Sequence, residues 1–167
     1  MKEILLAISF LSVELGNVKE AEINFLNQNP WLGFEPAKIE EIHKAENRLG
    51  IKLPEDYKEF LEISNGFKAT NSIEPTFMKV EEIDYLRNID KFTIEAYKLP
   101  ELENSILIAG KDEEQYFLLI PPTEKHKKWK YWKFANWYPG EHEFKNLKSY
   151  FKDVLKFSEN EYQKEKK

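Results

Sequence analysis

The sequence predicts an α+β domain in which a mainly antiparallel sheet is flanked by N-terminal helices and a C-terminal helix. Helical periodicity occupies the first part of the chain and its last part, and β-rich runs joined by a polar turn lie between them. Helices first, strands in the middle and a helix last are the order typical of this class. With 167 residues, 41% of them hydrophobic, the chain is long enough to bury one substantial core.

An amphipathic helix is predicted at residues 4–15. Its large apolar side chains recur at helical spacing, and Gly16-Asn17 is a typical helix end. The run is too short to span a bilayer, and Glu14 and the lack of a small-residue cleavage pattern argue against a secretory signal. We therefore expect residues 1–29 to form a helical extension packed on the domain, and the protein to be cytoplasmic with no membrane segment.

Two further helices are predicted at residues 37–49 and from Pro54 onward. Gly50 is placed to end the first in a left-handed conformation. Pro54 followed by two carboxylates is a start signal, because proline suits the first helical position and acidic side chains complement the positive end of the helix dipole. Asn65-Gly66 ends this second helix. The side chains expected to enter the core here are Leu53, Tyr57, Phe60 and Leu61.

The strands are predicted in the middle of the chain. Residues 105–109 and 115–120 are β-rich runs joined by Gly-Lys-Asp-Glu-Glu, which predicts an antiparallel hairpin with an acidic turn. A third strand is expected over residues 129–137. A weaker strand is expected over residues 77–80, before a short helix that starts near Glu81.

A last helix is predicted from the spacing of apolar residues near the C-terminus. Lysines fill its outer face, as expected for an amphipathic surface helix. The apolar residues that carry the pattern are Phe144, Leu147, Phe151, Val154 and Leu155. The domain is therefore expected to span residues 30–158, and residues 159–167 to be a frayed tail.

Several of these segments, taken in order, resemble the signature of the SUKH superfamily, which is named in part for the fungal Smi/Knr cell-wall synthesis regulators. The hairpin and the closing helix are similar to later elements of that family, so the resemblance spans about residues 30–157. The acidic turn at residues 112–114 departs from it, because members often have a glycine-rich turn there. The matching residues are Trp31 with Gly33, Glu46 with Leu49-Gly50, Leu53-Pro54 with Tyr57, Phe60-Leu61, and Asn65-Gly66.

This resemblance implies a protein that acts by binding another protein. The superfamily is mostly a bacterial group of immunity proteins, which bind and neutralise toxins of polymorphic or contact-dependent competition systems, many of them nucleases. Its fungal members act as regulatory scaffolds in cell-wall signalling. Neither role is enzymatic, so the expected partner is a protein, foremost a cognate toxin domain. The motif residues themselves are expected to define the fold and need not touch the partner.

A search of the residues for chemistry finds no catalytic constellation. The histidines are at positions 43, 126 and 142, and none has the spacing typical of a metal site. The sequence contains no phosphate-binding glycine-rich loop and no Gly-x-Ser-x-Gly motif. Cysteine is absent, which removes disulfides and thiolate ligands and fits a reducing compartment. We expect no catalytic residue, no metal site and no cofactor.

Glu46 is the carboxylate that most needs an explanation. It lies four residues after Ile42 and three before Leu49, which places it at or beside the apolar face of its helix. A buried carboxylate needs partners, and these are normally local. We expect Glu46 to accept hydrogen bonds from backbone amides near the Leu53-Pro54 turn, with contact to a partner protein as the alternative.

The charge is distributed unevenly along the chain. Residues 1–120 carry a net charge of −10 and residues 121–167 a net charge of +5. An acidic surface suits an inhibitor of a cationic nuclease, because complementary fields speed association and help to select the partner; an ordinary solvated surface is the alternative. The candidate partner-binding residues are Asp112, Glu113 and Glu114 in the hairpin turn, with Glu74, Glu81 and Glu82 nearby.

A basic segment supports a rival hypothesis. Residues 125–133 alternate lysines with aromatic residues, as nucleic-acid-binding surfaces do. In a strand, however, Trp129 and Tyr131 face one side while Trp132 and Phe134 face the other, so at least one pair belongs in a core. The overall acidity also weakens attraction to phosphate. The sequence therefore favours a protein partner over nucleic acid.

Overall fold

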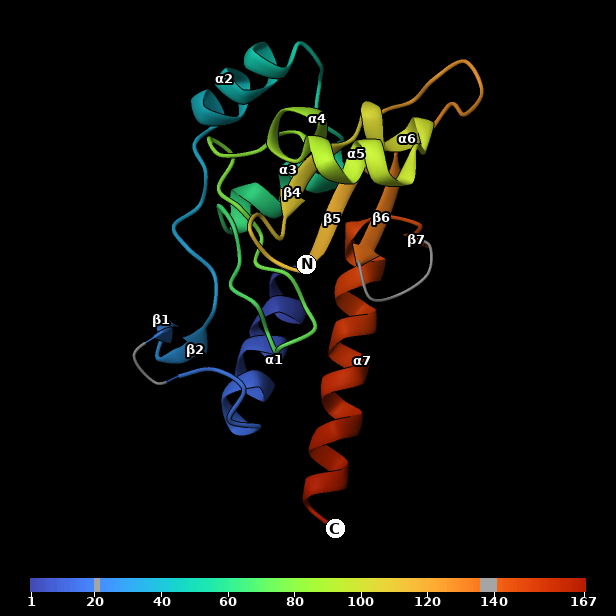
Figure 1. Ribbon diagram of the computed structural model, residues 1–167. Helices are drawn as coiled ribbons and strands as arrows, with labels where there is room; N and C mark the ends of the chain where they lie inside the picture. The colour runs from blue at the N-terminus through green and yellow to red at the C-terminus, as the bar shows by residue number, and fades with distance from the viewer. Residues whose placement is uncertain (20–21, 136–140) are drawn as a thin grey trace.

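The computed structural model describes residues 1–19, 22–135 and 141–167. Within these residues the chain confirms the α+β class: a five-stranded antiparallel sheet, in the order β3-β4-β5-β6-β7, is accompanied by seven helices and a separate β1-β2 hairpin (Figure 1). The strands are β1 (Asn24–Leu26), β2 (Asn29–Trp31), β3 (Asp84–Tyr85), β4 (Ile106–Ala109), β5 (Gln115–Ile120), β6 (Lys130–Ala135) and β7 (Glu141–Phe144). The helices are α1 (Lys2–Glu14), α2 (Ile39–Leu49), α3 (Glu55–Ile63), α4 (Leu86–Ile89), α5 (Lys91–Tyr97), α6 (Pro100–Glu103) and α7 (Leu147–Glu165).

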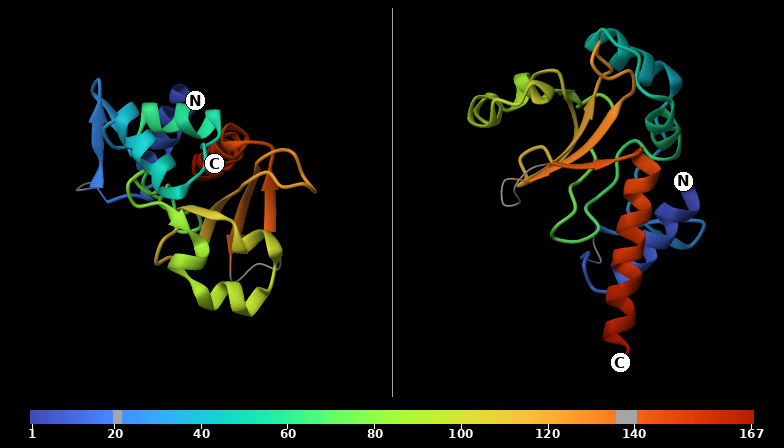
Figure 2. Two further views of the ribbon diagram at one scale, coloured as in Figure 1. Left: turned by 90° about the horizontal axis from the view of Figure 1, so that it is seen from above. Right: turned by 90° about the vertical axis from the view of Figure 1, so that its right-hand side faces the viewer.

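Helices cover both faces of the sheet. Seen from above, α3 and α7 lie on one side of it and α4–α6 on the other (Figure 2). On the second side the Tyr97 ring meets Phe134 edge-on, with ring centroids 4.8 Å apart. Because both faces are covered, neighbouring residues of β6 that point in opposite directions, Tyr131 and Trp132, are both buried.

An aromatic cluster fills the space between the sheet and α3 and α7. Phe60 of α3 stacks on Phe151 of α7 and tilts against Phe77, each at 5.5 Å between ring centroids. Phe117 of β5 continues the cluster to Tyr150, at 4.6 Å. The predicted inward residues Leu53, Tyr57, Phe60 and Leu61 are all buried, which confirms that part of the sequence analysis.

Helix ends follow the local signals closely. Gly50 has φ of +69° and ends α2 in the left-handed conformation, as predicted. Pro54 stands one residue earlier than expected, as the N-cap of α3 rather than its first helical residue. Asp56 in the first turn also joins distant elements, because its carboxylate accepts hydrogen bonds from the Tyr131 hydroxyl and, at 3.0 Å, from the Leu147 amide.

The hairpin of β4 and β5 is confirmed, and its turn requires a glycine. Gly110 has φ of +88°, a conformation that residues with a Cβ rarely adopt. A Cβ at this position would lie 1.8 Å from the Gln115 carbonyl oxygen. The glycine therefore allows the chain to double back closely before the acidic turn begins.

The segment from Phe77 to Glu82 differs from the prediction. The expected strand at 77–80 is absent from the described structure, where Phe77 makes only isolated bridges to Phe67 and Ala109. The helix expected near Glu81 begins instead at Leu86, after the short strand β3. The Arg48 guanidinium donates hydrogen bonds to the Ile83, Val80 and Glu81 carbonyls, which holds this segment as a turn.

The C-terminal part also needs correction. Phe144 lies in β7, and α7 starts after Asn146, whose side chain accepts a 2.8 Å hydrogen bond from the Ser149 amide. The helix continues to Glu165, so residues 159–165 are helical and do not form the expected frayed tail. The third predicted strand is observed over Lys130–Ala135; its predicted end at residues 136–137 lies outside the described residues.

The N-terminal helix packs beside α7 and against β2, as Figure 1 shows for the first of these contacts. Ser9 joins α1 to the segment just after β2, since its hydroxyl accepts a 3.1 Å hydrogen bond from the Leu32 amide. The β1-β2 hairpin that follows α1 was not predicted from the sequence. Its turn residues Asn27 and Gln28 both have positive φ, as in a type I′ hairpin turn.

Candidate functional site

Glu46 is satisfied locally, as the sequence analysis expected. It is buried, and its carboxylate accepts hydrogen bonds from the Leu53 amide at 3.0 Å and from the Lys52 ammonium at 2.7 Å. Burial by itself would raise the pKa of Glu46, but the hydrogen bonds from Lys52 and Leu53 and the charges of Lys52 and Lys58 outweigh it. The pKa therefore lies below its ordinary value, and the carboxylate fixes the turn between α2 and α3.

Most of the other motif positions are also buried, although Gly50, which ends α2, is exposed. The Asn65 side chain holds the segment at residues 80–81 in place. Its oxygen accepts a 2.7 Å hydrogen bond from the Val80 amide, and its nitrogen donates to the Glu81 carboxylate at 3.1 Å. Gly66 has φ of +96° and lies where a Cβ would approach the Phe77 carbonyl oxygen to 2.8 Å. The buried motif positions are Trp31, Glu46, Leu53, Pro54, Tyr57, Phe60, Leu61, Asn65 and Gly66. Their burial supports a structural role for the motif.

The acidic turn presents two of its three carboxylates to solvent. Asp112 and Glu114 are exposed. Glu113 is half-buried, and its carboxylate accepts a 3.1 Å hydrogen bond from the Thr76 amide. Asp112 and Glu114 are therefore available to a partner, whereas Glu113 helps to hold the turn against the neighbouring segment.

Glu74 does not belong with them. It is buried, and its carboxylate accepts a 2.7 Å hydrogen bond from the Tyr150 hydroxyl and pairs with Lys133 at 2.8 Å. A carboxylate held in this way joins the 74–76 segment to β6 and α7. We correct the expectation that Glu74 forms part of an exposed acidic face, because only the tertiary structure brings Tyr150 and Lys133 to it.

Glu81 and Glu82 are exposed, but they lie in a different local setting from the acidic turn. Glu81 accepts from Asn65, and the Glu82 carboxylate accepts a 3.3 Å hydrogen bond from the Lys79 amide. Among the described residues, no hydrogen bond or ion pair joins either of them to residues 112–114. A single docking face that contains both groups remains a prediction.

The basic strand is occupied by internal contacts. Lys133 pairs with Glu74, and Lys130 lies 3.6 Å from Glu101. Tyr131 and Trp132 are buried, so their rings are not free to stack on bases. The exposed lysines of this region lie in the preceding loop, at Lys125, Lys127 and Lys128.

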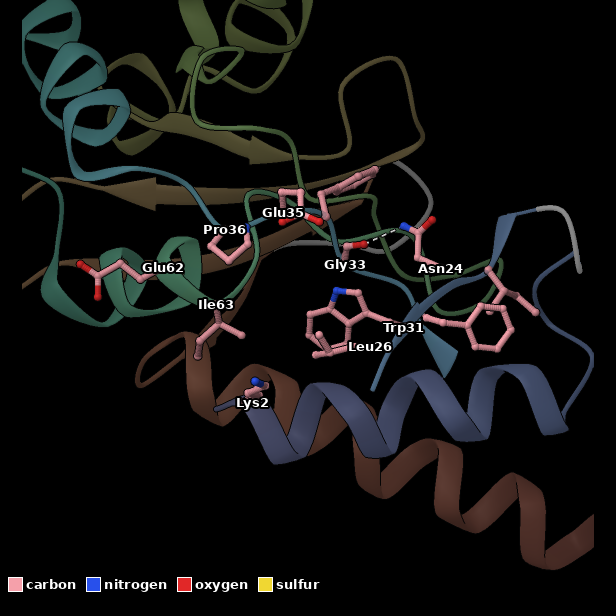
Figure 3. A pocket seen from close by; sticks show the side chains of 12 residues that line it. Lys2, Asn24, Leu26, Trp31, Gly33, Glu35, Pro36, Glu62 and Ile63 are labelled. Carbon is pink, nitrogen blue, oxygen red and sulfur yellow. Dashed lines mark hydrogen bonds between the residues drawn. The ribbon is translucent and has the colours of Figure 1, made fainter. Parts of the chain in front are cut away.

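A groove that the sequence analysis did not identify lies between α1, the β1-β2 hairpin and the end of α3 (Figure 3). Its volume is about 710 Å³. The lining comes from four parts of the chain: Lys2, residues 23–26, residues 31–36 without Leu32, and Glu62 with Ile63. Phe25 in its lining is 70% exposed, but that exposure is known only from the structure, so it gave no signal in the sequence.

Over residues 1–19, 22–135 and 141–167, no three histidine or carboxylate side chains are grouped so that they could hold a metal ion. In the same ranges, none of the helices combines the length and apolar character needed to cross a bilayer.

The order of elements, the buried motif positions and the helices on both faces of the sheet define an α+β domain built on one antiparallel sheet. Comparison with family models agrees: residues 36–160 match the family described as SMI1 / KNR4 family (SUKH-1), and the chain belongs to this family. A comparison with curated proteins finds no match. The matched residues include α2 to most of α7 and leave out α1 and the β1-β2 hairpin.

Proposed function

We propose that this chain is a non-enzymatic immunity protein that binds and neutralises a cognate toxin inside the cell that makes it. The observation that carries the proposal is family membership over residues 36–160, because domains of this family are generally protein-binding immunity modules. The acidic balance of residues 1–120 agrees with a cationic toxin, such as a nuclease, as the partner. A regulatory scaffold similar to the fungal members is the alternative within the same family.

Stoichiometry provides the direct test. The purified chain should abolish the activity of the toxin domain encoded beside its gene, with an end point at an equimolar ratio, because an inhibitor acts by occupying its target. Titration of toxin activity against chain concentration measures this. A chain that inactivates many toxin molecules each would be an enzyme, and a chain that leaves every neighbouring toxin active would favour the scaffold.

The exposed carboxylates of the acidic turn are the best candidates for steering association. Replacing Asp112 by asparagine, which tolerates its positive φ, and Glu114 by glutamine should slow association with the toxin several-fold at low salt. Dissociation and thermal stability should stay nearly unchanged, since rim charges act mainly on the association rate. Glu113 is left intact because its carboxylate accepts the hydrogen bond from the Thr76 amide. Stopped-flow or surface-based kinetics at several salt concentrations measures the effect.

The control replaces Lys127 and Lys128, two exposed lysines of the loop before β6, by serine. It should leave toxin association unchanged or slightly faster. If the lysine variant loses the toxin while the turn variant binds normally at every salt concentration, the docking face has been assigned to the wrong charges.

A further inference from the structure

The groove beside α1 has an apolar floor. Trp31 is buried with its ring along the groove, and the half-buried side chains of Leu26 and Ile63 add to the apolar surface. Gly33 makes this arrangement possible, because a Cβ there would lie 2.5 Å from the Trp31 ring. Phe25 also lines the groove, with 70% of its surface exposed. An exposed aromatic residue next to an apolar floor is typical of a protein-binding surface.

The margin of the groove is mainly acidic. Glu35 and Glu62 line it and are exposed, and among the residues that the structure describes Lys2 is the one basic residue of the lining. Among the described residues, neither carboxylate takes part in an ion pair, either with Lys2 or with any other side chain. Lys68 and Lys79 lie near the groove, at 5.8 and 5.7 Å from the Phe34 ring centroid, but they do not line it.

The hairpin that forms one wall is joined to the segment after β2 by a side-chain hydrogen bond. The Asn24 side chain donates a 2.9 Å hydrogen bond to the Gly33 carbonyl, which ties β1 to the segment after β2 (Figure 3). Asn24, Phe25 and Leu26 pair with Trp31, Pro30 and Asn29 in register. These contacts fix the position of the hairpin relative to the segment after β2.

Most of the lining precedes residue 36, where the match to the family model begins. Lys2, residues 23–26 and Glu35 precede the matched range, while Pro36, Glu62 and Ile63 fall within it. The groove is thus formed where an added N-terminal segment meets the family domain. A surface of this origin can give the chain a partner preference of its own.

We propose that this groove binds an extended segment of a partner protein in which a large apolar side chain is flanked by arginine or lysine. The apolar side chain would contact Trp31, Leu26 and Ile63, where burial of an aromatic anchor supplies much of the affinity. The flanking cations would reach Glu35 and Glu62, whose charges they complement. The inference rests on the proposed function only in that the partner is a protein.

Short peptides test the groove without the toxin. The probe is acetyl-Gly-Arg-Trp-Arg-Gly-amide, compared with peptides in which both arginines are replaced by serine or by glutamate. Titrated into the ¹⁵N-labelled full chain, the arginine peptide should shift the amide signals of residues 23–26, 33–35 and 62–63, with a Kd on the order of a millimolar or tighter. The serine peptide should bind more weakly and the glutamate peptide weakest.

A variant with reversed charge at Glu35 and Glu62 tests the role of the acidic margin. Replacing Glu35 and Glu62 by lysine should weaken the arginine peptide about five- to tenfold and reverse the preference between the arginine and glutamate peptides. Replacing the exposed Glu95 and Glu159 by lysine changes the net charge equally and should leave the affinity within about twofold. Circular dichroism and the amide spectrum confirm that both variants are folded.

Three outcomes would overturn the inference: equal affinity for all three peptides, shifts confined to other surfaces, or groove signals that move with chain concentration alone, which would mark a second copy as the occupant. Failure here with intact stoichiometric neutralisation would leave the immunity function standing and move the docking site elsewhere. Peptide binding at the groove without neutralisation of the toxin would support the groove as a binding site and contradict the proposed immunity function.

Discussion

Replacing Phe60 by alanine is expected to lower the free energy of unfolding by about 3 to 5 kcal/mol. Phe60 is fully buried, and its ring contacts Phe77 and Phe151, each at 5.5 Å, and Tyr57 at 6.1 Å. The truncation removes apolar surface and leaves a cavity between α3, α7 and the segment at Phe77, three parts of the chain that cannot close on one another without moving the sheet.

Urea unfolding followed by tryptophan fluorescence measures this loss, and Phe92→Ala is the matched control. Phe92 has the same side chain but is 80% exposed, so its replacement should change stability by less than about 0.5 kcal/mol. Equal stability of the Phe60 variant and the wild-type protein would contradict the position of α3 in the core.

Replacing Glu46 by alanine is expected to cost about 1 to 3 kcal/mol near neutral pH, because the buried Leu53 amide loses its acceptor. The folded pKa of Glu46 is lowered, so its stabilising contribution is present above the pKa of the unfolded chain, about 4.5, and is lost as pH falls through the folded value. The difference between the variant and the wild-type protein should therefore be largest near neutral pH and shrink in acid.

Urea midpoints measured between about pH 7 and about pH 3 check this dependence. Glu40→Ala is the control, since Glu40 is an exposed carboxylate on the same helix and its change should cost less than about 1 kcal/mol. A stability difference that is constant over the whole range would show that the charged form of Glu46 does not stabilise the fold.

Local signals predicted most of the elements. The αL glycine after α2, the Pro54 start of α3 and the Gly110 turn each depend on backbone geometry within a few residues, so the sequence predicts them directly. Segments without such a signal were missed: β7 begins with three exposed polar residues, and the β1-β2 hairpin uses Asn27-Gln28 in place of a glycine-containing turn.

The candidate site was less predictable, because surface and interior cannot be separated from sequence alone for charged residues. Glu74 and Glu114 look alike in the sequence, yet one is buried against Tyr150 and Lys133 and the other is exposed. Glu46 was the exception. Its place on the apolar face of a helix indicated burial, and the turn that follows supplied the donor.

By itself, the sequence determined the class of fold, the helices around the family motif, the central hairpin and the acidic character of residues 1–120, since these depend on periodicity, capping and composition within short stretches of chain. Only the tertiary structure decided that both faces of the sheet are covered, that the lysines of β6 pair with Glu74 and Glu101, and that α1, the β1-β2 hairpin and the end of α3 form a groove. The physical reason is that each of these contacts joins residues far apart in the chain, and their meeting depends on how the whole core packs.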